Sequence, residues 1–143
     1  MTDWTVNTRL RFGAYWVIAF GGLMSLSLFP PVSGVLNFAV DMVFWPLDGL
    51  QITDSSASKL LTAVIGGITS GWGVTVLLLS GDIADRAPES VRRVALSGYL
   101  TWFTVDGVGS VIAGAPWNLL GNTLFLCLLV VPLLKAYPRD AVA

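Results

Sequence analysis

The chain has 143 residues, of which 55% are hydrophobic and 12% are charged, and its net charge is -1. The charged share is about half that of a typical soluble protein, and a water-soluble globule could not bury this much apolar surface. The near-neutral charge and the scattered basic residues offer no surface for nucleic acid. The sequence therefore predicts an all-α membrane protein, with residues 1–143 forming one domain in the lipid bilayer.

Histidine is absent, and there is one cysteine. A chain without histidine lacks the usual ligand of haem, copper and zinc and also the commonest general base. One cysteine cannot form an intramolecular disulfide or a cysteine metal cluster. We therefore expect no cofactor, no metal site and no catalytic residue, and we predict that the protein is not an enzyme.

Four apolar stretches are long enough to cross the hydrocarbon layer, which takes about 20 helical residues. They cover Gly13–Phe29, Leu60–Leu79, Val94–Ala113 and Ala115–Leu134. Pro30 and Pro31 are expected to end the first helix, because neither ring permits a further helical turn. The pattern predicts a bundle of four transmembrane helices.

The connection between the first two stretches is long and apolar and needs its own assignment. Asn37 and Asp41 lie on one narrow polar stripe that continues to Asp48. We predict an interfacial or re-entrant helix over about Gly34–Trp45, with its polar stripe towards water or towards polar residues of the bundle. The alternative, a fifth span, would place Asp41 at its centre at a cost of about 2.5 to 3.5 kcal/mol.

The placement of the basic residues favours four crossings. With four, only Lys59 lies on the outer side, and seven basic residues lie on the cytoplasmic side: Arg9, Arg11, Arg86, Arg92, Arg93, Lys135 and Arg139. This agrees with the positive-inside rule. Five crossings would carry the arginines after the second stretch to the outer side. We therefore predict that both termini are cytoplasmic.

Small residues recur in the second stretch on two adjoining strips, one with Ala63, Gly67 and Gly71 and the other with Gly66, Ser70 and Gly73. Such residues let helix backbones approach closely in lipid. We predict that Ala63, Gly66, Gly67 and Gly71 are helix-packing positions. Gly21, Gly22 and Ser25 are the expected counterparts in the first stretch. Packing within the bundle is favoured over a homodimer, because four helices need mutual contacts.

The last two stretches carry the main candidate site. Asp106 lies inside a span, where a charge is costly and is a functional-site hypothesis by default. If the chain reverses at Gly114, Asp106 and Asn122 are each eight residues from the turn. Ser110 and Asn118 are each four residues from it. Equal spacing puts each pair at one depth, so Asp106 should reach Asn122 and Ser110 should lie near Asn118.

The predicted polar cluster therefore contains Asp106, Ser110, Asn118 and Asn122, and Trp102 extends it one turn deeper. Gly66 and Gly67 are expected at a similar depth, where they could admit a backbone or a ligand. Two interpretations of the cluster stay open. It is either a structural clamp, with hydrogen bonds of about 0.6 to 2 kcal/mol each, or a site for a ligand, an ion or a proton.

The segment WFTVDGVGSVIAGAPWNLLGN resembles the closing hairpin of small four-helix inner-membrane proteins of proteobacteria, similar to the DoxX-like group. The resemblance covers about the last 45 residues, a length of two membrane helices. It implies four helices and a bacterial inner membrane, and it implies no reaction, cofactor or substrate.

We expect a non-catalytic accessory or assembly subunit of a larger membrane complex, with a membrane protein or further copies of this chain as its partner. Small size, short soluble loops and glycine-rich helix faces favour this function. The alternative is a protein that binds or transports a quinone, a lipid or an ion through Asp106 and Asn122.

Overall fold

The computed structural model describes residues 5–134. Within this range every regular element is helical, which confirms the predicted all-α class. The helices are α1 (Val6–Leu26), α2 (Pro30–Phe44), α3 (Ser56–Leu79), α4 (Asp82–Arg86), α5 (Pro88–Ile112) and α6 (Asn118–Leu134). Lys135 and Arg139, which contribute to the predicted charge asymmetry, lie outside the described residues.

The helix ends follow local sequence signals. Thr5 and Ser55 are the N-caps of α1 and α3, and their side chains accept hydrogen bonds from the backbone N–H groups three residues later. Pro30 begins α2 instead of only ending the preceding helix, because proline fits the first helical turn, where no N–H partner is needed. Pro88 begins α5 in the same way, so this helix starts six residues before the predicted Val94.

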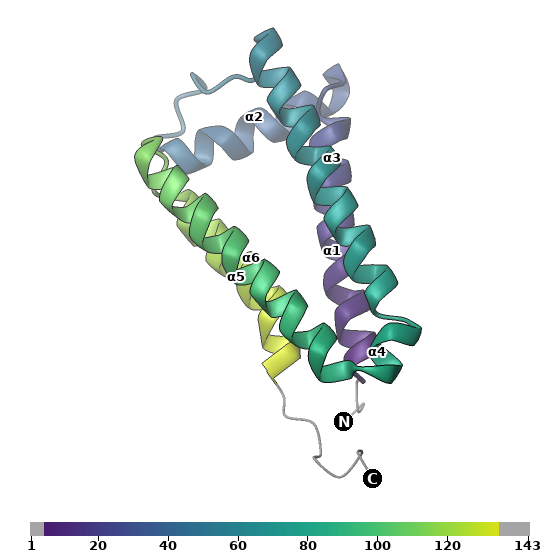
Figure 1. The fold of residues 1–143 in the computed structure, drawn as a ribbon. Coiled ribbons are helices and arrows are strands. Elements are labelled where there is room, and N and C mark those ends of the chain that lie inside the picture. Colours follow the sequence, from purple (N-terminus) through teal and green to yellow (C-terminus); the bar gives the residue numbers. More distant parts are fainter. Residues whose placement is uncertain (1–4, 135–143) are drawn as a thin grey trace.

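The helices form two pairs that meet at one end of the molecule (Figure 1). In one pair α1 and α3 run alongside each other for most of their length, and in the other α5 and α6 form a hairpin. The two pairs diverge from the end that contains α4. At the opposite end α2 turns by 113° from α1 and crosses towards the tip of the α5/α6 hairpin.

Glycine makes the close contact between α1 and α3. A Cβ atom on Gly21 would lie 2.6 Å from the Ser70 backbone nitrogen, and one on Gly73 would lie 2.9 Å from the Ile18 nitrogen. Gly66 is equally restricted, since its Cβ would lie 2.9 Å from the Gly21 carbonyl oxygen. The backbones of α1 and α3 therefore touch at positions that exclude any side chain.

The predicted packing strip was only partly correct. Gly66 packs against α1, whereas a Cβ atom on Gly67 or Gly71 would meet nothing within 4 Å. Gly22, on α1, is equally open. Ala63, on the same predicted strip, is half-buried. The contact instead follows the adjoining strip of Gly66, Ser70 and Gly73, because only one of two neighbouring strips on a helix can face a given partner.

Apolar side chains from five helices form a core where the pairs meet. It contains Leu10, Ala14, Val17, Val76, Ala84, Val91, Ala95, Tyr99, Leu129 and Leu133. Rings from four helices continue it towards α2. Trp72 on α3 lies 5.2 Å from Tyr99 and 6.5 Å from Trp102 on α5, measured between ring centroids. On α6, Phe125 lies 5.8 Å from Trp102 and 5.5 Å from Phe20 on α1.

Outside this core, many large apolar side chains on the described helices are exposed. Ile68, Val105 and Leu124 are 68%, 68% and 66% exposed. Among the described helices, α3 alone is long and apolar enough to cross a membrane as a single helix, and α1 with α2 meets the same criteria as a bent pair. Membrane association is thus weakly suggested, and the four-span bundle stays a prediction.

Two of the predicted spans do not meet those criteria for identifiable reasons. The apolar helix α6 has 17 residues, because Ala115–Trp117 belong to the turn and not to the helix. Helix α5 has 25 residues but includes Glu89, Arg92, Arg93 and Asp106 together with many small and hydroxyl residues, so its hydropathy is low.

Candidate functional site

The predicted polar cluster is present between α5 and α6. The Asn122 amide nitrogen donates to Asp106 Oδ2, and the Asn118 amide nitrogen donates to the same oxygen at 3.3 Å. Asn118 Nδ2 also donates to Ser110 Oγ at 2.8 Å. The predicted contacts of Asp106 with Asn122 and of Ser110 with Asn118 are therefore confirmed, and Asn118 joins the two pairs.

The turn geometry explains why these side chains meet. Gly114 has a φ angle of 78°, a left-handed conformation that glycine adopts at little cost, and it reverses the chain between the helices. The short turn fixes the register of the two helices. Ser110 and Asn122 are 8% and 9% exposed, and Asp106 is half-buried. Ser110 and Asn122 thus form the closed part of the cluster, and Asp106 and Asn118 are its more accessible members.

Trp102 does not extend the hydrogen-bonded cluster as predicted. Its ring packs instead against Trp72, Phe103 and Phe125 in the aromatic contact between the helix pairs. Gly66 is likewise unavailable to a ligand, because α1 occupies the space beside it. Trp102 lies on the predicted side of α5, but the approach of α3 gives its ring an apolar partner that the sequence does not indicate.

The inner end of the hairpin is held by a second set of polar contacts. Arg92 Nη1 donates to the Leu133 carbonyl oxygen at 3.0 Å, which joins the start of α5 to the end of α6. Arg92 also donates to both carboxylate oxygens of Glu89 at 2.9 Å, and this hydrogen bonding lowers the pKa of Glu89. The polar cluster and Arg92 therefore hold the two helices at opposite ends of the hairpin.

A third polar set connects α2 to the loop that follows it. Both carboxylate oxygens of Asp41 accept from the Gly49 N–H, at 3.2 and 3.1 Å. Asn37 Oδ1 accepts from the Thr53 N–H at 3.0 Å and from the Thr53 hydroxyl at 2.7 Å. We call these four residues the outer clasp. The helix predicted over Gly34–Trp45 is present as α2, but the expected orientation of its polar stripe was wrong.

The stripe binds its own loop rather than water or the polar cluster. Gly49 has a φ angle of 73° and helps to bring the loop back along α2. The partner groups are mainly backbone N–H groups, which every loop residue except proline carries, so the side-chain pattern gave no signal for this pairing. The glycine at position 49, with its positive φ angle, is a local feature that indicates a reversal at this point.

The described side chains offer limited chemistry. Within residues 5–134, no group of three or more cysteine and acidic side chains is placed to hold a metal ion. The cluster provides one carboxylate, two amides and one hydroxyl, which can form hydrogen bonds or bind a positive charge.

No known protein family matches the sequence, and comparisons with characterised proteins and with solved structures give no match. The similarity of the last hairpin to DoxX-like proteins therefore stays a prediction.

Proposed function

We propose that this chain is a four-span inner-membrane protein that acts as a non-catalytic accessory or assembly subunit of a larger membrane complex. One observation carries the proposal: the two helix pairs make contact near one end and diverge towards the other (Figure 1). The diverging parts expose apolar side chains from all the long helices. Surfaces of this kind fit lipid together with helices of a partner.

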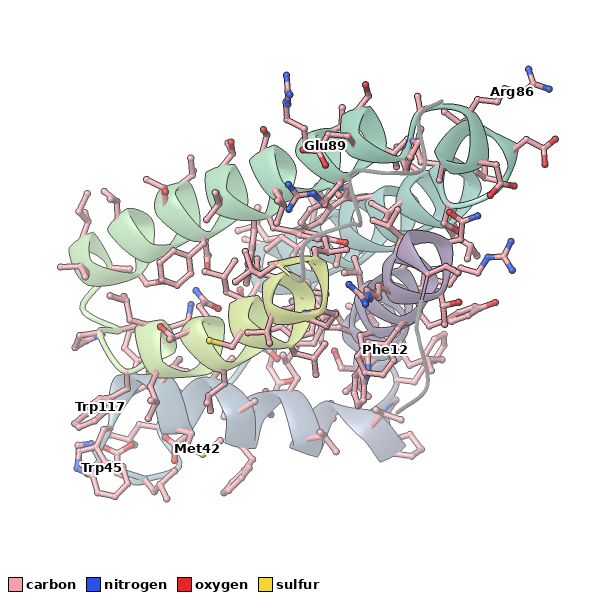
Figure 2. All side chains as sticks on the ribbon, turned by 90° about the horizontal axis from the view of Figure 1, so that it is seen from below. Phe12, Met42, Trp45, Arg86, Glu89 and Trp117 are labelled. Atoms are coloured by element: carbon pink, nitrogen blue, oxygen red, sulfur yellow. The ribbon has the colours of Figure 1, made fainter. Side chains whose placement is uncertain are left out.

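The position of charged residues supports four crossings. Arg9, Arg11 and Arg86 lie on α1 and α4 at the end where the pairs meet, and Arg92 and Arg93 begin α5 at the same end. Lys59 lies in the first turns of α3, at the opposite end. Figure 2 views the molecule from the first of these ends, with Arg86 directed outward. This separation fits a protein whose arginine-rich end faces the cytoplasm.

The polar cluster supports a non-catalytic role. Both amide donors are directed at the Asp106 carboxylate, so they stabilise the hairpin and are not available to a substrate. A membrane enzyme normally gathers several polar groups around the reacting atoms. In the outer clasp, the Asn37 and Asp41 oxygens likewise accept hydrogen bonds from the loop after α2.

The test is the mass of the protein extracted from its native membrane in a mild detergent or in polymer-bounded lipid discs. We expect native mass spectrometry to find one copy or a few copies of this chain in a defined complex with another membrane protein. Recovery only as a monomer or homo-oligomer, at native expression level and in both extraction systems, would contradict the proposal.

A binding protein for a quinone, a lipid or an ion is the second candidate, because Asp106 keeps an accessible carboxylate oxygen. The same extraction distinguishes it. A monomer that carries a stoichiometric quinone or lipid, which is lost when Asp106 and Asn122 are replaced, would favour binding over assembly.

A further inference from the structure

Asp106 has no counter-charge in the membrane part of this chain. It is the one charged residue within the four predicted spans. A charge in such a position is normally paired. The described contacts of Asp106 are hydrogen bonds from two neutral amides, which orient the carboxylate but do not neutralise it.

Half of the carboxylate is unused by the described residues. Asn118 and Asn122 both donate to Oδ2, and no described hydrogen bond reaches Oδ1. An ionised carboxylate can accept about four hydrogen bonds. Because Asp106 is half-buried rather than enclosed, a donor from outside the chain can approach Oδ1.

Two glycines leave space on one side of this carboxylate. Gly109 directly precedes Ser110, and Gly121 directly precedes Asn122. One residue turns a helix by about 100°. Each glycine is therefore rotated by about 100° from a residue at the contact between α5 and α6. Since the two helices are antiparallel, the two rotations have opposite sense, and both glycines lie on the same side of the hairpin. A Cβ atom on either glycine would meet nothing within 4 Å.

This side of the hairpin, which we call its inner side, faces the other helix pair. Trp102 and Phe125 lie on it, and their rings contact Trp72 on α3 and Phe20 on α1. Beyond these rings the pairs diverge towards the hairpin turn (Figure 1). In the sequence, Gly109 lies between Trp102 and the turn, and Gly121 lies between the turn and Phe125. The inner side therefore combines two open glycines with an anion that lacks a cation.

We propose that a transmembrane helix of a partner subunit packs against the inner side of the hairpin and places a lysine or arginine on Asp106 Oδ1. This inference rests on the proposed function. Open glycines permit the close backbone approach by which helices associate in lipid. The partner's cation supplies the charge that the four predicted spans lack, and it is itself stable at this depth only when paired.

A partner cation fits the cluster better than a bare metal ion does. A hard cation such as calcium prefers six or more oxygen ligands. Here the amide nitrogens of Asn118 and Asn122, and not their oxygens, point at Asp106. An ammonium or guanidinium group brings several donors of its own and needs only the remaining carboxylate oxygen.

The test places a photoreactive aliphatic amino acid at Val105, beside Asp106 and on the inner side. Val111 is the matched control, because it is a similarly exposed valine of α5 on the opposite side of the hairpin. Irradiation in the native membrane should link position 105, but not 111, to a helix of another protein. That helix should carry a lysine or arginine at mid-membrane depth.

Charge exchange makes the test decisive. Asp106→Asn should lower the yield of this adduct about tenfold or more, because it removes the charge pair. Asp106→Lys should abolish the adduct, and a second change of the partner's cation to Asp should restore it. Adducts with lipid alone, a linked helix without a cation, or a yield unchanged by Asp106→Asn would each overturn the inference.

Native electrophoresis of the same membranes separates this inference from the proposed function. If the complex is present but position 105 gives no adduct, the subunit function is supported and the role of Asp106 is refuted. The same holds if Asp106→Asn leaves the amount of complex unchanged. Absence of any complex refutes both.

Discussion

The Asp106 carboxylate accepts hydrogen bonds from two amides. Replacing it with an apolar side chain and replacing it with a neutral amide should therefore lower the free energy of unfolding by different amounts. Asp106→Leu leaves the Asn122 nitrogen without its acceptor and leaves the Asn118 nitrogen with Ser110 alone, and it should lower the free energy of unfolding by about 1 to 3 kcal/mol. Asp106→Asn keeps an acceptor oxygen and should lower it by less than about 1 kcal/mol. Reversible unfolding in mixed micelles measures both, with Val108→Leu, at an exposed position of the same helix, as the control.

Equal losses in Asp106→Leu and Asp106→Asn would show that the negative charge, and not the hydrogen bonding, holds the hairpin.

Gly66 and Gly67 are neighbours with opposite surroundings. A Cβ atom on Gly66 collides with α1, whereas one on Gly67 enters open space. Gly66→Ala should therefore destabilise the protein by about 1 to 3 kcal/mol through overpacking. Gly67→Ala should be neutral or stabilise it by up to about 1 kcal/mol, because alanine favours the helix. The same unfolding assay compares the two, and a greater loss at Gly67 would contradict the observed α1/α3 contact.

At the scale of the elements, the outer clasp is the feature that orders the loop after α2. Asn37→Ala and Asp41→Ala each remove the acceptor for loop N–H groups, at about 1 kcal/mol per hydrogen bond. Amide hydrogen exchange at Gly49 and Thr53 should become about fivefold faster or more. Ser33→Ala is the control, since the Ser33 hydroxyl donates to the Pro30 carbonyl oxygen within α2 and not to the loop. Unchanged exchange would mean that packing, not the clasp, orders the loop.

The predictable elements are those with periodic signals. Equal spacing from Gly114 was sufficient to predict the contact between Asp106 and Asn122, because a short turn between antiparallel helices allows little slip. The sequence predicts that one of two strips of small residues on α3 contacts α1. It does not predict which strip, since the rotation of α3 about its axis depends on all its neighbours. The spacing of Trp102 from Asp106 predicts it beside the polar cluster, and the sequence gives no indication that α3 brings Trp72 against its ring.

The arrangement of the whole molecule is the least predictable part. A four-helix bundle usually packs its helices along their lengths. Here the α5/α6 hairpin meets α1 and α3 through the core near α4 and then diverges, and α2 crosses the open end. Hydrophobic pattern alone does not distinguish a face that meets lipid from one that meets another helix, because both are apolar.

The central claim is that the chain crosses the membrane four times with its arginine-rich end in the cytoplasm. Single cysteines at Ser56, Ala113 and Ser90, which are all exposed, test it in a Cys127→Ser background. A membrane-impermeant maleimide should label Ser56→Cys and Ala113→Cys in intact cells with a permeabilised outer membrane. It should label Ser90→Cys only after the inner membrane is opened. Labelling of Ser56→Cys and Ser90→Cys from the same side would contradict the four-span topology.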